Sequence, residues 1–212
     1  MSAKDKLHEY RARRDFARTS EPAAGDEAAA GGRAPIFVIQ EHAASHHHFD
    51  FRLEVDGVLV SFAVPKGPSL DPSERRLAVR TEDHPLAYAD FEGIIPEGEY
   101  GAGLVIVWDR GGYENVSEKD GRQLTMAEAL DKGHVRVRLA GQKLRGVFSL
   151  IHARLGGEDK NWLLMKEKGE GADARRRPAT TQPESVASGR TLAEMAAAAG
   201  KTGTGDSRKR RK

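Results

Sequence analysis

The sequence predicts an all-β domain, mainly antiparallel, that closes into a compact barrel with a few short flanking helices. Short apolar runs recur between Ile36 and Lys168, and turns containing glycine separate most of them. The pair Asp56–Gly57 joins two of these runs, which is the strongest short-range signal for a β-hairpin. Few of the runs carry the charges that protect an exposed sheet edge, so a closed barrel is favoured over a sandwich.

The chain divides into four parts. Residues 1–20 form an arm in which residues 3–16 combine charges with sparse apolar positions, a pattern typical of a short amphipathic helix. Residues 21–35 are rich in alanine, glycine and proline and predict a flexible connector. The barrel follows over residues 36–168, and residues 169–212 are expected to form a disordered basic tail.

Strands within the barrel are expected wherever an apolar or alternating run is bounded by turn residues, such as Gly111 and Gly112. The expected strands span residues 36–40, 47–55, 58–64, 76–80, 104–109, 134–139, 146–153 and 161–168. One helix interrupts them, because Thr125 and Glu128 have the spacing of a capping box and Gly133 ends the segment.

Composition limits the class of the protein. Hydrophobic residues make up 38% of the 212 residues and the mean hydropathy is −0.60, which is low for a chain that is folded throughout. A net charge of +2 does not by itself indicate a nucleic-acid binder, but basic residues cluster at Arg175–Arg177 and Arg208–Lys212. The second cluster would contact phosphates by charge alone, or would simply keep the tail soluble.

Cysteine is absent, which excludes disulfides, thiolate zinc sites and cysteine nucleophiles. The N-terminus lacks the apolar segment of a signal peptide, and no apolar run approaches the length of a membrane span. We therefore expect a soluble, cytoplasmic protein without a membrane partner.

The stretch from His48 to Arg52 carries the clearest chemical signal. Because the side chains of a strand alternate between its faces, His48, Asp50 and Arg52 share one face, and the phenylalanines between them point into the core. His42, which precedes the strand, is expected to fold back and supply a third ligand. Two imidazoles and one carboxylate suit Mn, Fe, Zn or Co and leave coordination positions open. Arg52 could then hold an anion bound to the metal, although polar decoration of a barrel strand is the plain alternative.

A second group of polar residues surrounds the turn after the fourth expected strand. Arg76, Glu82, His84 and Tyr88 lie close together in the sequence, and a histidine beside acidic residues is a candidate general acid or base. Lys66 lies in a turn with proline and glycine, where it could also hold a phosphate. The alternative is a solvated loop without a catalytic role.

Two other classes of function are compatible with these residues. One is a barrel oxygenase in which Fe(II) is held by His48, Asp50 and a distant histidine, either His134 or His152. The other is a non-catalytic module that binds DNA ends through a basic face. The oxygenase is disfavoured because His42 is so near in the sequence, and because the arginines and lysine of the other motifs would have no shared purpose.

Several separate motifs resemble the 3′-phosphoesterase domain of bacterial DNA ligase D. They are QEHAASHHHFDFRLEVDG, AVPKGPS, RRLAVRTEDHPLAYADFEGIIPEGEYGAG, GQKLRGVFSLIHA and NWLLMKEK, and the arm adds RDFARTSEP. The resemblance runs from about Tyr10 to Lys168. It implies a compact β-barrel enzyme that binds Mn²⁺, with Co²⁺ or Zn²⁺ as substitutes.

The resemblance also implies an activity and partners. Members of the family remove a terminal ribonucleoside to leave a 3′-phosphate, and then convert this phosphate to a 3′-hydroxyl. Their substrates are DNA or DNA–RNA primer–template 3′ ends in bacterial non-homologous end joining. The implied partners are a DNA ligase D and the Ku end-binding protein, in a nucleoid-associated cytoplasmic location. No ligase or polymerase motif accompanies the domain, so we expect a stand-alone phosphoesterase.

The resemblance assigns site residues motif by motif. The implied metal ligands are His42, His48 and Asp50, and the implied catalytic residues are Arg52, His84 and Tyr88. The positions implied to bind phosphate or to support the site are Arg14, Asp15, Glu21, Gln40, Lys66, Arg76 and Glu82. The residues of the arm are implied to contribute to the active site, mainly for the ribonuclease step.

One departure from the family concerns the second metal ligand. The family usually has an apolar residue directly before it, whereas this chain has His46 and His47 before His48. Either extra imidazole could offer an alternative ligand. Strand alternation favours His48 over His47, because His48 shares a face with Asp50.

Overall fold

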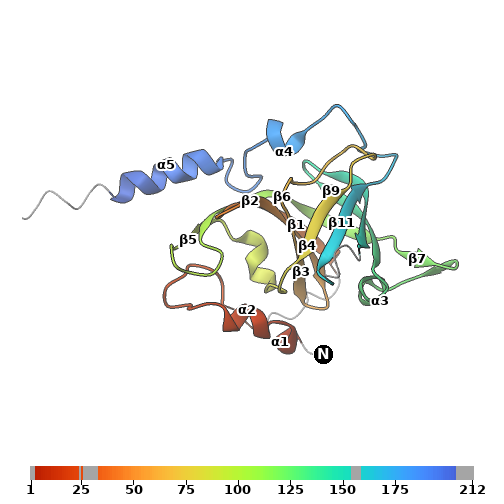
Figure 1. Ribbon diagram of the computed structural model, residues 1–212, viewed down its shortest axis with the longest axis horizontal. Helices are drawn as coiled ribbons and strands as arrows, with labels where there is room; N and C mark the ends of the chain where they lie inside the picture. Colours follow the sequence, from red (N-terminus) through yellow and green to blue (C-terminus); the bar gives the residue numbers. More distant parts are fainter. Residues whose placement is uncertain (1–2, 24, 26–32, 154–158, 204–212) are drawn as a thin grey trace, which may run out of the picture.

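The computed structural model describes residues 3–23, 25, 33–153 and 159–203. Eight antiparallel strands close into a barrel in the order β1-β2-β3-β4-β11-β10-β9-β6, and β6 returns to β1 (Figure 1). The prediction of an all-β closed barrel is therefore confirmed. The barrel strands are β1 (Ile36–Ala43), β2 (His47–Val55), β3 (Val58–Val64), β4 (Arg76–Arg80), β6 (Gly103–Asn115), β9 (His134–Gly141), β10 (Arg145–His152) and β11 (Asn161–Lys166).

Short elements decorate the barrel. Strand β5 (Gly93–Ile95) pairs with β6 outside the closed set, and β7 (Glu118–Lys119) and β8 (Arg122–Gln123) form a separate hairpin. The helices are α1 (Ala3–Lys6), α2 (His8–Ala12), the 3₁₀ helix η1 (Leu86–Asp90), α3 (Met126–Asp131), α4 (Pro178–Thr181) and α5 (Leu192–Gly203). None of the helices in the described ranges is long and apolar enough to cross a membrane.

The hairpin of β2 and β3 forms as the sequence predicts. Asp56 and Gly57 have φ angles of 48° and 80°, the left-handed pair that a tight two-residue hairpin turn requires. This turn sets the register, so that Arg52 lies opposite Ser61 and Phe51 lies opposite Phe62. The aromatic side chains face the core and the polar ones face the opposite side, as alternation demands.

Large aromatic side chains from strands around the whole barrel fill its core. The Phe49 and Trp108 ring centroids are 5.3 Å apart, and those of Phe62 and Trp162 are 5.4 Å apart, both pairs meeting edge to face. The polar face of β2 is also buried, with Asp50 only 5% exposed. The segments around α2 and η1 cover this face, so its polar groups must be satisfied within the protein.

Strand β1 is longer than the sequence indicates, and this corrects the placement of His42. The expected strand ended at residue 40, and His42 was expected to fold back from a loop. Instead β1 continues to Ala43, and His42 lies within the strand directly opposite His48. Pairing with β2 on one side and β6 on the other extends β1 beyond its apolar run.

Strand β6 also exceeds its prediction of residues 104–109, because Gly111 and Gly112 form part of the strand instead of a turn. Gly111 lies opposite Gly141 of β9, where the two backbones approach closely. A Cβ atom built on Gly111 would lie 2.1 Å from the Ala140 carbonyl oxygen. Glycine at this position therefore allows the contact between β6 and β9 that helps to close the barrel.

The two flanking helical predictions have different outcomes. Helix α3 has the predicted capping box, with both reciprocal hydrogen bonds between Thr125 and Glu128, and Gly133 follows it with a φ of 70°. The N-terminal segment forms the two short helices α1 and α2 and ends at Ala12, where a single helix to residue 16 was expected.

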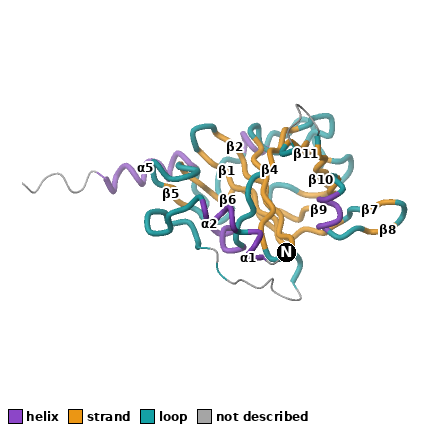
Figure 2. The backbone as a smooth tube through the Cα atoms, turned by 60° about the horizontal axis from the view of Figure 1, so that its bottom comes forward, coloured by secondary structure: helices purple, strands orange, loops and turns teal. Residues whose placement is uncertain are grey.

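The prediction of a disordered tail from residue 169 is wrong for much of its length. The Trp108 indole donates to the Gln182 carbonyl (2.8 Å), and the Val186 amide donates to the Val107 carbonyl (2.9 Å). These contacts hold the segment before α5 against the barrel, whereas α5 itself extends away from it (Figure 2). The basic cluster Arg208–Lys212 lies outside the described residues.

The expected connector at residues 21–35 is only partly described, since residues 24 and 26–32 lie outside the described ranges. Its first residue does not behave as part of a linker. The Glu21 side chain is fully buried and forms an ion pair with Arg14. The sequence offered no apolar periodicity here, and the contact depends on charge instead of hydrophobic patterning.

The adjacent glycines of β6 provide a stability test. Replacing Gly111 by alanine should lower the free energy of unfolding by about 2 to 3 kcal/mol, because the new methyl group meets the Ala140 carbonyl. Gly112→Ala is the matched control: its Cβ would come no nearer than 3.9 Å to another residue's atoms, so its effect should stay within about 0.5 kcal/mol. Urea unfolding followed by tryptophan fluorescence measures both, and equal effects would contradict the proposed close approach.

Candidate active site

Three side chains on two paired strands form a candidate metal centre. His42 of β1 lies opposite His48 of β2, and Asp50 follows two residues later on the same face. One ligand atom from each side chain lies within 4.8 Å of the other two. The Asp50 Oδ2 atom is 3.6 Å from His42 Nδ1 and 3.6 Å from His48 Nε2.

Backbone carbonyls orient both imidazoles. His42 Nε2 donates to the Gly101 carbonyl (2.9 Å), and His48 Nδ1 donates to the His46 carbonyl (2.8 Å). Because a carbonyl oxygen only accepts, these nitrogens carry the hydrogens. The lone pairs then lie on the nitrogens that face Asp50, as ligation of a metal requires. The donor set therefore fits a divalent cation held by two imidazoles and one carboxylate.

The neighbouring histidines point elsewhere. His47 Nε2 donates to Glu41 Oε1 (2.7 Å) on the other face of the sheet, and the His47 side chain is 52% exposed. His46 is exposed and contributes only its carbonyl to the orientation of His48. The geometry thus groups His48, and not His47, with His42 and Asp50.

Asp50 is held in its ionised form. Burial raises the pKa of this carboxyl, but the Arg52 guanidinium and the two neighbouring histidines outweigh burial and hold the pKa well below its usual range. Arg52 Nη2 lies 3.1 Å from Asp50 Oδ2. The carboxylate is therefore available as an anionic ligand at neutral pH.

Arg52 is fixed by hydrogen bonds on several sides. Its Nε donates to Gln40 Oε1 (2.8 Å) and its Nη1 donates to Ser61 Oγ (2.8 Å), in addition to the ion pair with Asp50. Gln40 is itself held because its amide nitrogen donates to the Tyr88 carbonyl (2.9 Å). Gln40 and Ser61 therefore fix the orientation of the guanidinium before any ligand binds.

His84 lies beside Arg52 and is uncharged. Burial lowers the pKa of His84, and the Arg52 and Arg14 cations lower it further, so the pKa lies well below its usual value. His84 Nδ1 is 2.9 Å from the Glu82 carbonyl and Nε2 is 3.3 Å from Arg14 Nη2. A carbonyl only accepts and a guanidinium only donates, so Nδ1 carries the hydrogen and Nε2 carries the lone pair. The Arg52 Nη1 atom near Nδ1 donates to Ser61 instead.

The N-terminal arm brings Arg14 to this site. Arg14 pairs with Glu21 (2.9 Å) and Glu82 (3.2 Å), and its guanidinium stacks on the Tyr10 ring at 3.8 Å. The Tyr88 hydroxyl donates to Glu21 Oε1 (2.9 Å), and burial holds the Tyr88 pKa well above its usual value, so the phenol stays protonated. The arm is thus tied to the barrel through charged and hydroxyl groups.

The candidate metal ligands and the residues around Arg52 and His84 face one cavity of about 260 Å³. The predicted residues that line it are Arg14, His42, His48, Asp50, Arg52, Glu82, His84 and Tyr88. Gln40 and Glu21 lie behind this wall and hold its members in place.

Three predicted residues lie away from the cavity wall. Asp15 is exposed and accepts a hydrogen bond from the Ala17 amide (3.0 Å), which shapes the turn that follows Arg14. Lys66 and Arg76 line a separate groove of about 500 Å³.

The structure adds site residues that sequence reasoning missed. Tyr10 packs on both Arg14 and His84, and Tyr100 lines the cavity and accepts a hydrogen bond from Arg13 (2.7 Å). Ser61 could have been found, because counting back from the Asp56–Gly57 turn places it opposite Arg52. The spacing of Tyr10 and Arg14 by four residues was also visible, but nothing in the sequence indicated where the arm would dock.

Fold and site together define a β-barrel domain with a candidate metal centre beside an arginine- and histidine-lined cavity. The DNA Ligase D 3′-phosphoesterase domain matches residues 40–152, just over half of the chain, and the chain belongs to this family. The matched segment contains the metal cluster, Arg52 and His84, whereas Arg14 lies before it.

Relatives with curated descriptions are similar over most of this chain. The chain is 46% identical over 194 residues to the multifunctional non-homologous end joining protein LigD of Pseudomonas aeruginosa, which covers 91% of this chain and 22% of that protein. It is 46% identical over 169 residues to the protein of the same description from Mycolicibacterium smegmatis, covering 77% of this chain and 21% of the relative. It is 45% identical over 166 residues to the multifunctional non-homologous end joining DNA repair protein LigD of Mycobacterium tuberculosis, covering 78% of this chain and 20% of the relative. The chain thus spans about a fifth of the length of these relatives.

The grouping of the histidines can be tested by metal titration. His48→Ala should weaken Mn²⁺ binding by at least about 100-fold, because one of the three ligand atoms is lost. His47→Ala is the matched control, since that imidazole binds Glu41, and it should leave the affinity within about threefold. Isothermal titration calorimetry measures both, and a larger loss with His47→Ala would reverse the assignment.

The same titration has an expected pH dependence. Burial lowers the pKa of His48, but the hydrogen bond and the charge of Asp50 raise it more, so the net shift is upward. A metal displaces the proton from the imidazole. Mn²⁺ affinity should therefore weaken as the pH falls through neutrality, and an affinity unchanged between pH 8 and about pH 6 would contradict a histidine ligand.

Proposed function

We propose that this chain is a metal-dependent 3′-end-healing enzyme of DNA repair in bacterial non-homologous end joining. It acts as a 3′-phosphomonoesterase and a 3′-ribonuclease on DNA and DNA–RNA primer–template ends, with Mn²⁺ as the metal and Co²⁺ or Zn²⁺ as substitutes. The observation that carries the proposal is the shared cavity, in which a His–His–Asp cluster faces two buried arginines and a buried neutral histidine.

The arginines are arranged to hold a phosphate. Arg52 and Arg14 are buried and already oriented by hydrogen bonds, and the N–H groups that these bonds leave over can donate to phosphate oxygens. The Tyr88 hydroxyl donates to Glu21, the carboxylate that also pairs with Arg14, and so helps to hold this arginine in place. A divalent cation bound at the cluster would add Lewis-acid stabilisation of the phosphate oxygens.

His84 is the proposed proton carrier. Its Nε2 lone pair faces Arg14, and its low pKa results from burial and from the two guanidinium cations. An anionic phosphate bound between Arg14 and Arg52 would offset these charges and raise the proton affinity of Nε2. The substrate itself thus prepares His84 to hold a proton and to release it to the leaving oxygen.

The biological setting is proposed from the family alone. The proposed partners are primer–template 3′ ends, a DNA ligase D and the Ku protein, in the nucleoid of the cytoplasm.

The oxygenase alternative loses its basis because, among the described residues, neither His134 nor His152 belongs to the cluster of candidate metal ligands. His152 instead donates to the Asp159 carbonyl (2.9 Å), and His42 occupies the third position.

Activity on defined DNA ends tests the proposal. With Mn²⁺ present, the protein should release phosphate from a 3′-phosphate primer–template and should shorten a primer that ends in one ribonucleotide, both resolved on a gel. His84→Ala and Asp50→Ala should each reduce phosphate release at least about 1,000-fold, because they remove the proton carrier and a metal ligand. Both variants should keep the circular dichroism spectrum of the folded barrel.

A control variant and three contradicting results complete this test. His46→Ala removes an exposed ring outside the cavity and should keep near-normal activity. Normal activity in His84→Ala or Asp50→Ala would refute the scheme. A requirement for 2-oxoglutarate would indicate the oxygenase, and salt-sensitive DNA binding without any product would indicate a non-catalytic module.

A further inference from the structure

A cluster of cations outside the cavity is formed by two segments far apart in the sequence. The loop between β3 and β4 contributes Lys66 and Arg75, and β4 begins with Arg76; these three line the groove of about 500 Å³ together with Pro65, Glu74 and Leu77. The segment after β11 contributes Arg175–Arg177 beside it. We call this groove together with the six cations the basic groove.

Several contacts hold the second segment against the first. The Asp173 amide donates to the Leu70 carbonyl (2.9 Å), and Arg177 Nη2 lies 3.8 Å from Glu74 Oε1. A Cβ atom built on Gly67 would lie 3.2 Å from the Ala179 side chain, so the two segments are in close contact there. Arg175–Arg177 therefore lie on a segment that is fixed against the barrel, and they do not belong to a flexible charged tail.

The basic groove has an excess of positive charge with free donors. Its six cations face three carboxylates, namely Asp71, Glu74 and Asp173, which leaves a net charge of +3. Arg75 makes no hydrogen bond or ion pair with any residue that the structure describes. The Arg175 side chain is 94% exposed, and only its Nε lies near a carboxylate, 3.7 Å from Asp173 Oδ1. Exposed guanidinium groups of this kind can bind phosphate oxygens.

The groove lies next to the candidate active site. Ala63 of β3 pairs with Asp50 of β2 and lines the cavity. Lys66 follows Ala63 by three residues, which spans at most about 10 Å of extended chain. A polyanion whose end lies in the cavity would therefore reach the basic groove within a few phosphates.

We propose that the basic groove binds the sugar–phosphate backbone of the DNA strand or duplex whose 3′ end enters the cavity. This inference rests on the proposed function for the identity of the polyanion. The groove offers charge and little apolar surface, since Leu77 is its one large exposed hydrophobic residue among those described, at 42%. An acidic protein partner would need a larger apolar contact, so the observations favour nucleic acid.

Equilibrium binding to a duplex without a reactive end tests the groove separately from catalysis. We would measure fluorescence anisotropy of a labelled 24-base-pair duplex with 3′-hydroxyl ends in EDTA, at several salt concentrations. The triple variant R175A/R176A/R177A should bind at least about tenfold more weakly. Its plot of log affinity against log salt should be shallower by about 2 to 3 units, since each lost phosphate contact removes about 0.9.

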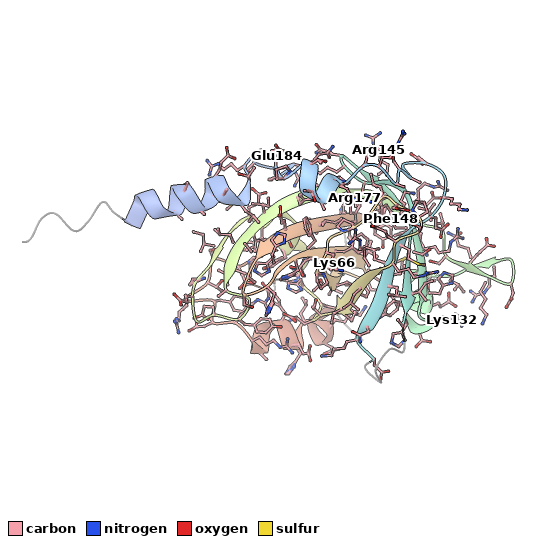
Figure 3. All side chains as sticks on the ribbon, turned by 45° about the horizontal axis from the view of Figure 1, so that its top comes forward. Lys66, Lys132, Arg145, Phe148, Arg177 and Glu184 are labelled. Atoms are coloured by element: carbon pink, nitrogen blue, oxygen red, sulfur yellow. The ribbon has the colours of Figure 1, made fainter. Side chains whose placement is uncertain are left out.

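The matched control removes the same charge from a distant surface. The control variant K119A/R122A/K132A acts on the β7–β8 hairpin and the end of α3, and Figure 3 shows Lys132 at an edge of the molecule away from Lys66 and Arg177. Its affinity and salt dependence should match those of the original protein. On a long 3′-phosphate duplex, the R175A/R176A/R177A variant should raise KM and leave kcat within about twofold, as expected for a binding surface away from the reacting phosphate.

The outcomes separate this inference from the proposed function. Unchanged affinity and salt dependence in R175A/R176A/R177A would overturn the inference, and so would an equal loss in the control variant or an absence of duplex binding by the original protein. Weaker binding by this variant together with no phosphate release by the original protein would keep the groove and refute the proposed activity. Thermal unfolding would show that both variants are folded.

Discussion

The ion pair between Arg52 and Asp50 is the interaction on which the site depends. Both side chains are buried, and two buried charges cost several kcal/mol unless further groups satisfy them. Gln40 and Ser61 accept hydrogen bonds from the arginine, and the arginine itself lies 3.1 Å from the carboxylate, whose charge a bound cation would compensate further. The alternation of β2 places the pair on the face opposite the aromatic core, so one strand positions both the proposed metal ligand and the proposed phosphate-binding group.

The N-terminal arm completes the site by satisfying the remaining charges. Arg14 would be costly to bury alone, but Glu21 from the arm and Glu82 from the barrel accept its hydrogen bonds on two sides. The same Glu21 accepts from Tyr88, which places the arm, the 3₁₀ helix η1 and the barrel in one network. The arm therefore docks through these charges together with Leu7 and Tyr10, which are buried in the core, and Phe16, which packs against it.

Local patterns predicted the parts of this protein that depend on neighbours in sequence. The Asp56–Gly57 turn, the alternation of β2 and the capping box of α3 were all read correctly, because each depends on a few adjacent residues. His42 was chosen as a ligand but placed in a loop, since the pairing that extends β1 comes from β2 and β6. Gly111 was read as a turn because a sequence does not show which backbone passes close to it.

Residues whose roles depend on distant segments were the hardest to place. Tyr10 of the arm packs on His84, whereas Tyr100, from the loop before β6, lines the cavity, and no periodic pattern connects the two. The ordered segment after β11 was read as a tail because its contacts use backbone carbonyls, such as that of Gln182, and leave no apolar signature. Sequence composition reports the tendency of a segment to bury apolar surface, and this segment is held by hydrogen bonds together with a few isolated apolar contacts, those of Pro178, Ala179 and Val186.

The charges of the site explain why metal and phosphate sites occur together. The buried groups Arg14 and Arg52 face the carboxylates Asp50, Glu21 and Glu82, which gives a net charge of −1 while His84 stays neutral. A bound dication changes this sum to +1, and a phosphate monoester dianion returns it to −1. At each stage the buried cavity carries only one uncompensated charge, whereas a dianion entering without the cation would bring the sum to −3. Coulomb repulsion in a poorly screened interior makes a net charge of −3 costly, so a bound cation raises the affinity for the phosphate. A bound phosphate raises the affinity for the cation by the same factor.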